Sequence, residues 1–133
     1  MQTYDVQSIR IAVPADQAFA YIAKPENLPR WTNAFATADL AQARMHTPAG
    51  EVEIALKTVT SEAAGAVDWH MTFPDGAVAT AFSRVTPDGE GSIYSFVLMA
   101  PPVPLEQLEG ALEEQKGILA EELRTLKAQL EAI

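Results

Sequence analysis

The sequence contains no cysteine and only two histidines, His46 and His70. The absence of cysteine excludes disulfides, thiol nucleophiles and thiolate metal ligands. Metal sites usually need three or four converging ligands, and neither histidine has a second histidine or a carboxylate at a typical ligand spacing. We therefore expect no metal site and no built-in cofactor.

Basic residues are also scarce, with nine Lys and Arg against 18 Asp and Glu and a formal net charge of −9. Nucleic-acid affinity comes largely from Lys and Arg that displace counterions, so we expect no DNA or RNA binding. The chain lacks a run near the roughly 18 apolar residues that a membrane span needs. Its first five residues lack a basic region followed by an apolar run, which predicts a cytoplasmic protein without a transmembrane segment.

Several motifs of enzymes are missing as well. The sequence has no Gly-x-Ser-x-Gly elbow, no phosphate-binding loop and no dinucleotide fingerprint, which argues against hydrolase and nucleotide-binding functions. The 133 residues are 48% hydrophobic and 20% charged, which is ordinary globular usage. A chain of this length buries roughly two thirds of its unfolded surface. We expect a single domain over residues 1–133.

The first part of the chain predicts a strand followed by two short helices. Apolar residues from Val6 to Val13 indicate the strand, and Pro14 is well placed to begin a helix that ends at about Ala23. Pro25 and Pro29 flank a second, very short helix.

The middle of the chain predicts an antiparallel meander. Its breaks carry turn chemistry, since proline comes early and glycine late in 48–50, 74–76 and 87–89. The expected strands are Ala36–His46, Glu51–Thr60, Val67–Phe73, Val78–Val85 and Ile93–Met99.

The last segment, Leu105–Ile133, predicts one long helix with an apolar stripe at helical spacing. The stripe indicates packing on the sheet, although a coiled-coil zipper is a rival interpretation. Gln115 and Glu122 occupy stripe positions that are otherwise apolar. A polar group there needs a partner or water. We leave open whether Gln115 faces a cavity, and we expect Glu122 to be exposed.

This order of elements resembles the START-like superfamily, also called SRPBCC. The segment from Pro25 to Trp31 is similar to a motif of its bacterial polyketide cyclase/dehydrase-type members. The resemblance implies an α+β helix-grip fold, in which a curved antiparallel sheet wraps around a long C-terminal helix and two short helices lie between strands 1 and 2. It also implies an elongated apolar cavity between sheet and helix.

The resemblance leaves three functions open, because fold alone does not decide activity. The first is binding of a small, largely apolar ligand, such as a lipid, quinone, polyketide or aromatic molecule, by a monomer or homodimer. The second is a cofactor-independent cyclase or dehydratase that uses the same cavity. The third is a co-chaperone-like interaction module. We favour a binding protein over an enzyme.

The expected cavity wall is drawn mainly from large apolar side chains. Each of them could equally be plain core packing. The candidate ligand-binding residues are Trp31, Phe35, Trp69, His70, Phe82, Tyr94, Phe96, Leu112, Gln115 and Leu119.

The weak catalytic candidates are His70, Asp68, Arg84 and Tyr94, and the role of the first three depends on strand register. A three-residue loop at 74–76 places Asp68 and His70 on one face with Arg84, where they would form a polar cluster in the cavity. A two-residue loop at 75–76 instead turns His70 away from Arg84. The sequence does not decide between these registers.

Overall fold

The structure is a computed structural model that describes residues 3–47, 50–100 and 105–133, with only the backbone described for residue 47 and residues 105–112. In chain order the elements are β1 (Tyr4–Ile11), α1 (Ala15–Ile22), the 3-10 helix η1 (Pro25–Asn27), α2 (Leu28–Trp31), β2 (Phe35–Ala38), β3 (Gln42–Thr47), β4 (Gly50–Ser61), β5 (Ala66–Thr72), β6 (Val78–Asp88), β7 (Gly91–Met99) and α3 (Leu105–Glu131).

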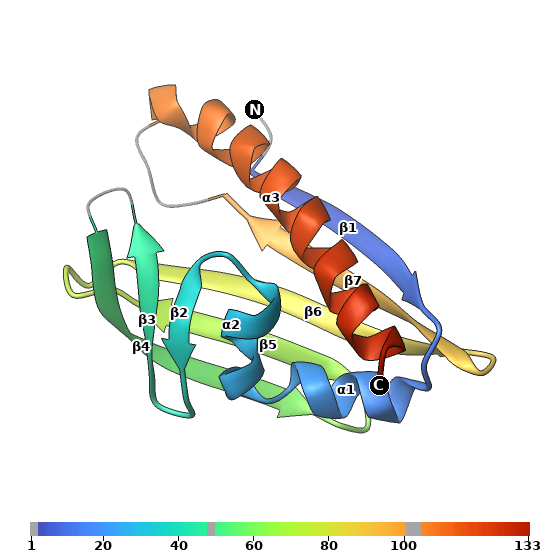
Figure 1. The fold of residues 1–133 in the computed structure, drawn as a ribbon. Coiled ribbons are helices and arrows are strands. Elements are labelled where there is room, and N and C mark those ends of the chain that lie inside the picture. Colours follow the sequence, from blue (N-terminus) through green and yellow to red (C-terminus); the bar gives the residue numbers. More distant parts are fainter. Residues whose placement is uncertain (1–2, 48–49, 101–104) are drawn as a thin grey trace.

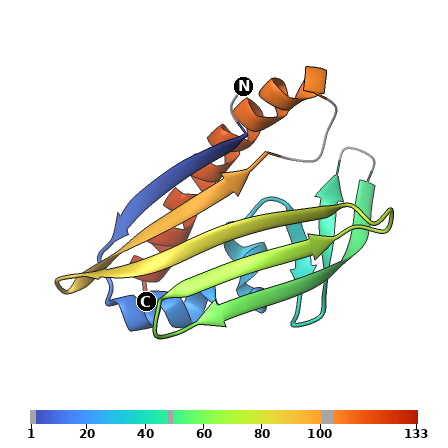
Figure 2. The same ribbon diagram turned by 180° about the vertical axis from the view of Figure 1, so that it is seen from behind.

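The seven strands form one antiparallel sheet in the order β1-β7-β6-β5-β4-β3-β2. The sheet is curved, and α3 crosses its concave side together with α1 and α2 (Figure 1). The view from behind shows the opposite side of the sheet, with α3 beyond the strands (Figure 2). The predicted α+β helix-grip fold is confirmed.

One predicted strand is wrong, because residues 36–46 form the hairpin of β2 and β3 instead. The Asp39 carboxylate accepts the backbone N–H groups of Ala41 at 2.8 Å and Gln42 at 2.9 Å, which closes the turn. The turn contains neither glycine nor proline, the residues by which the other turns were predicted, so the sequence pattern did not indicate a turn here.

The short helices bring their apolar sides against the sheet. Pro14 precedes α1, whose residues Ala18 and Ile22 are buried. Leu28 and Trp31 of α2 are buried as well. The spacing of three residues puts both on one side of the helix. This places the Trp31 ring over the concave side of the sheet.

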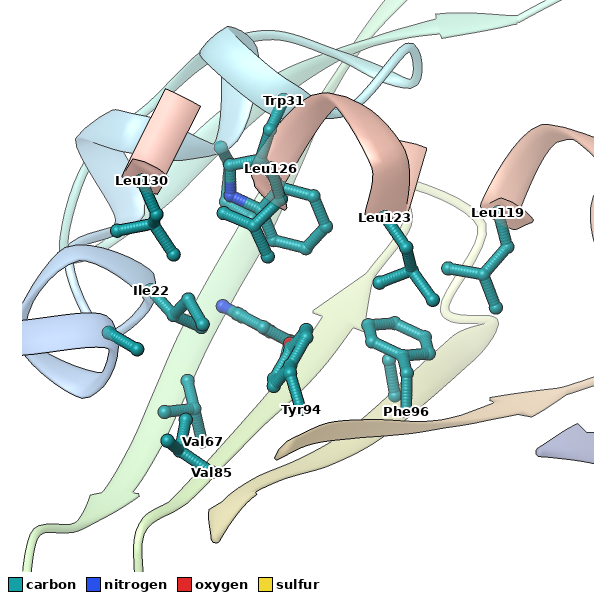
Figure 3. Packing of buried hydrophobic residues seen from close by; sticks show 14 of the residues in the cluster. Ile22, Trp31, Val67, Val85, Tyr94, Phe96, Leu119, Leu123, Leu126 and Leu130 are labelled. Carbon is teal, nitrogen blue, oxygen red and sulfur yellow. The ribbon is translucent and has the colours of Figure 1, made fainter. Parts of the chain in front are cut away.

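The core lies between α3 and the middle strands. Four leucines of α3 are buried there: in Figure 3, Leu119 and Leu123 lie on the side of Phe96, Leu126 lies beside Trp31 and Leu130 lies nearer Ile22. The stripe therefore packs on the sheet, as predicted, but its buried part ends at Leu130 because Ile133 is 76% exposed. Polar contacts also fix the helix, since the Tyr21 hydroxyl donates to Gln129 Oε1 at 2.7 Å.

Candidate functional site

A cavity of about 1050 Å³ lies between the concave side of the sheet, α3 and the segment after α2. Its surface is mostly apolar. The wall includes Leu28 and Trp31 of α2, Phe35, Met45 and Val52 of β2 to β4, Trp69 and Met71 of β5, Ala79 and Ala81 of β6, Phe96 and Leu98 of β7, and Gln115, Ile118, Leu119 and Glu122 of α3.

Small side chains on β6 make room for this cavity. Ala79 pairs with Met71 and Ala81 with Trp69, so the two alanines share the concave side with these large residues. Alanine at both positions leaves a gap that larger side chains would fill, whereas ordinary protein interiors contain few voids larger than a water molecule. The alternation of small and large residues is therefore the local cause of the cavity.

Aromatic rings form one end of the wall. The ring centroids of Trp31 and Trp69 are 6.5 Å apart, and Trp69 stacks on Phe96 at 6.0 Å. Tyr94 packs edge-on against Trp31 at 6.3 Å, but it is fully buried and does not line the cavity. Burial raises the pKa of the Tyr94 hydroxyl above its usual range. Tyr94 therefore supports the wall from behind.

Four polar atoms near this end are covered by protein and have no hydrogen-bond partner among the described residues: Trp31 Nε1, Trp69 Nε1, Tyr94 OH and Thr58 Oγ1. Ser83 lies beside Tyr94, but its hydroxyl donates to Val67 O at 2.6 Å. An unpaired buried group costs about 1–3 kcal/mol. Because protein covers the indole nitrogens, the two tryptophans present carbon surface to the cavity.

Glu122 is the half-buried carboxylate in the wall. Its Oε2 accepts the backbone N–H of Asn33 at 2.6 Å, which joins α3 to the segment after α2. Burial raises the pKa of Glu122, and the Asn33 bond partly opposes this effect. The expectation that Glu122 is exposed is wrong, because the stripe of α3 faces the cavity at this position. The position of Glu122 on the apolar stripe was the feature of the sequence that indicated a place in the cavity wall.

The predicted polar cluster does not form in the cavity. Residues 74–76 make the three-residue loop, with Gly76 at φ 88°, and Asp68 pairs with Phe82 while His70 pairs with Thr80. This register places Asp68, His70, Phe82 and Arg84 on one face, as one alternative required, but that face is opposite to Trp69 and points away from the cavity.

The contacts of these outward residues agree with this placement. His70 packs edge-on against Phe82 at 6.3 Å, and Arg84 Nε donates to the Ala64 carbonyl at 2.9 Å. Phe82 is 37% exposed. Strand alternation identified the set of residues that share a face, but it did not reveal which face is concave.

The structure brings six of the ten candidate ligand-binding residues to the cavity: Trp31, Phe35, Trp69, Phe96, Gln115 and Leu119. Tyr94 lies behind the wall, whereas His70 and Phe82 lie on the other side of the sheet. The side chain of Leu112 lies outside the described residues. Sequence analysis missed Glu122 as a member of the wall.

No three His, Asp or Glu side chains among the described residues come together in a way that could hold a metal ion. No helix in the described part of the chain is long and apolar enough to cross a membrane.

Comparisons with known proteins agree with this geometry. The sequence profile of the family described as "Polyketide cyclase / dehydrase and lipid transport" matches residues 6–131. No curated protein sequence matches the chain.

Solved structures of low sequence identity share the fold. XoxI from Bacillus cereus is 17% identical, with 97% of this chain and 96% of that chain covered and a TM-score of 0.72. A START superfamily protein from Mycobacterium smegmatis is 12% identical, with 98% and 99% covered and a TM-score of 0.68. The Zhui aromatase/cyclase from Streptomyces sp. R1128 is 10% identical, with 96% and 93% covered and a TM-score of 0.69.

Proposed function

The chain belongs to the polyketide cyclase/dehydrase and lipid transport family, and we propose that it binds a small, largely apolar molecule between its sheet and α3. A lipid, a quinone, a polyketide or an aromatic compound has the required character. The observation that carries this proposal is the mostly apolar cavity of about 1050 Å³. Binding pockets typically measure about 300–1,000 Å³, whereas structural voids in protein interiors are far smaller.

Burial of apolar surface supplies the affinity in this proposal. A ligand that removes roughly 300 Å² of its own apolar surface from water gains about 7 kcal/mol. Part of this gain is offset by the freedom that the ligand loses on binding. The carbon surfaces of Trp31, Trp69 and Phe96 provide contacts that do not depend on one exact ligand shape. The site therefore suits an aliphatic or aromatic body.

The second candidate function is a cofactor-independent cyclase or dehydratase acting in the same cavity. Glu122 favours it, because a carboxylate with a raised pKa in a pocket is a candidate general acid or base. Binding needs only the apolar wall, so we place it first. An interaction module gives the cavity no role and has the least support. A cytoplasmic location and a monomeric or homodimeric state remain predictions.

A cavity-filling substitution tests the proposed function. Ala79→Phe places a ring in the cavity, and Val78→Phe adds the same residue type on the other side of β6, where Val78 is 53% exposed. We expect an uncharged hydrophobic dye to bind the wild type and the Val78→Phe variant, with affinity lost in the Ala79→Phe variant. Thermal unfolding of each variant shows whether it is folded. Equal dye affinity in the two folded variants would place the dye elsewhere and contradict the proposal.

A further inference from the structure

The charged side chains that line the cavity are acidic, apart from His46. They are Glu51, Asp75, Glu114 and Glu122, and no Lys or Arg in the described part of the chain lines the cavity with them. Glu51 lies 3.7 Å from Arg44 and 3.5 Å from His46. The other three carboxylates have no ion-pair partner among the described residues.

The sequence adds that no basic residue occurs between Arg84 and Lys116. Lys116 does not line the cavity, and its ammonium lies 3.0 Å from the Glu113 carboxylate. A negatively charged group of a ligand at α3 would therefore lie near Glu114 and Glu122, which have no ion-pair partner among the described residues. Like charges repel, and the repulsion is stronger in a partly dry pocket than in water. The acidic wall thus disfavours fatty acids and other anionic amphiphiles.

Glu122 is placed to recognise the polar end of a ligand. Only its Oε2 is used within the protein, by the Asn33 N–H, and its Oε1 has no hydrogen bond among the described residues. The side chain lines an otherwise mostly apolar cavity. A half-buried carboxylate oxygen in such a setting accepts a hydrogen bond strongly, since water there is restricted.

We propose, on the basis of the proposed function, that the ligand carries a hydroxyl or a protonated amine at its polar end and that Glu122 accepts a hydrogen bond from this group. The same acidic wall selects against carboxylate ligands. The apolar body of the ligand lies along Trp31, Trp69 and Phe96, and its polar end lies at α3. Both groups would donate a hydrogen bond to an ionised acceptor, but only the ammonium adds the attraction between opposite charges, so the amine binds more tightly than the alcohol.

Three ligands with one apolar body test this inference: dodecylamine, dodecanol and dodecanoate. Each is kept below its critical micelle concentration and competes with an uncharged dye at neutral pH and fixed ionic strength. We expect the amine to bind most tightly, the alcohol next and the carboxylate at least about tenfold more weakly than the alcohol, which corresponds to roughly one strong polar contact.

Two variants separate a local effect from the net charge. Glu122→Gln removes the carboxylate from the wall, whereas Glu121→Gln removes an equal charge from an exposed position that pairs with Arg124. We expect Glu122→Gln to weaken amine binding by about tenfold, as the loss of a charge-assisted bond predicts. Glu121→Gln should keep the wild-type order and affinities.

The outcomes distinguish this inference from the function on which it rests. If dodecanoate bound the wild type as tightly as dodecanol, the inference would be overturned, and this result does not depend on whether either variant folds. Equal amine affinities in folded Glu122→Gln and Glu121→Gln variants would overturn the role of Glu122. Failure of the dye and all three ligands to bind the wild type would instead overturn the proposed function.

Discussion

Truncation of two leucines on α3 should have different costs, because one packs in the core and the other borders the cavity. Leu126 is fully buried and lies beside Trp31 (Figure 3), and its side chain does not line the cavity. Leu119 is 3% exposed but lines the cavity. Leucine-to-alanine changes in close-packed cores cost about 2.7–5 kcal/mol, and much of this comes from lost contacts around the new void.

We therefore expect Leu126→Ala to lower the free energy of unfolding by about 4 kcal/mol and Leu119→Ala by only about 2 kcal/mol. Part of the Leu119 side chain already faces empty space, so fewer contacts are lost. For a chain of this length, 1 kcal/mol shifts the melting temperature by about 3–4 °C. The expected shifts are thus about 14 °C for Leu126→Ala and about 7 °C for Leu119→Ala.

Urea unfolding of the ligand-free protein measures this difference. The dependence of the unfolding free energy on urea should be the same for both variants, since each exposes a similar surface. Equal losses at the two positions would mean that Leu119 is packed as closely as Leu126. That result would refute the reasoning that an open cavity borders Leu119.

Two further predictions concern polar groups. Tyr94→Phe should change the free energy of unfolding by less than about 1 kcal/mol or raise it, because the buried hydroxyl has no partner among the described residues; a loss above about 2 kcal/mol in urea unfolding would reveal a hydrogen bond. Hydrogen bonds from Lys127 and the Ala12 N–H lower the pKa of Glu131 from its usual value of 4.5. The ionised Glu131 therefore stabilises the fold at pH values above 4.5, and this stabilisation is lost as the pH falls through the lower pKa of the folded state. The difference in melting temperature between wild type and Glu131→Gln should shrink with acidification, and a difference that does not change with pH would contradict this.

The order of elements could be predicted from the sequence because turn residues and the leucine stripe mark it. Pro74 to Gly76 identified a loop, and the stripe of α3 identified the cover of the sheet. The turn between β2 and β3 escaped because the Asp39 side chain closes it without glycine or proline. Turns marked by proline and glycine can thus be recognised in a sequence more readily than a turn closed by the hydrogen bonds of one side chain.

The site was harder to predict, since alternation along a strand does not tell which face is concave. His70 and Trp69 are neighbours in sequence, yet only Trp69 lines the cavity. The curvature of the whole sheet and the position of α3 decide this, and both depend on contacts far apart in the chain. Gln115 and Glu122 were visible as polar residues on an apolar stripe, but their environment required the three-dimensional arrangement.

Quenching of tryptophan fluorescence tests the ligand-binding cavity most directly, because the chain has only two tryptophans and both line it. A brominated long-chain alcohol quenches a tryptophan on contact and fits the proposed ligand class. We predict saturable quenching in the wild type and in Val78→Phe, and a marked loss of affinity in Ala79→Phe. Quenching that rises linearly without saturation, or that is identical in the two folded variants, would contradict a ligand bound against Trp31 and Trp69.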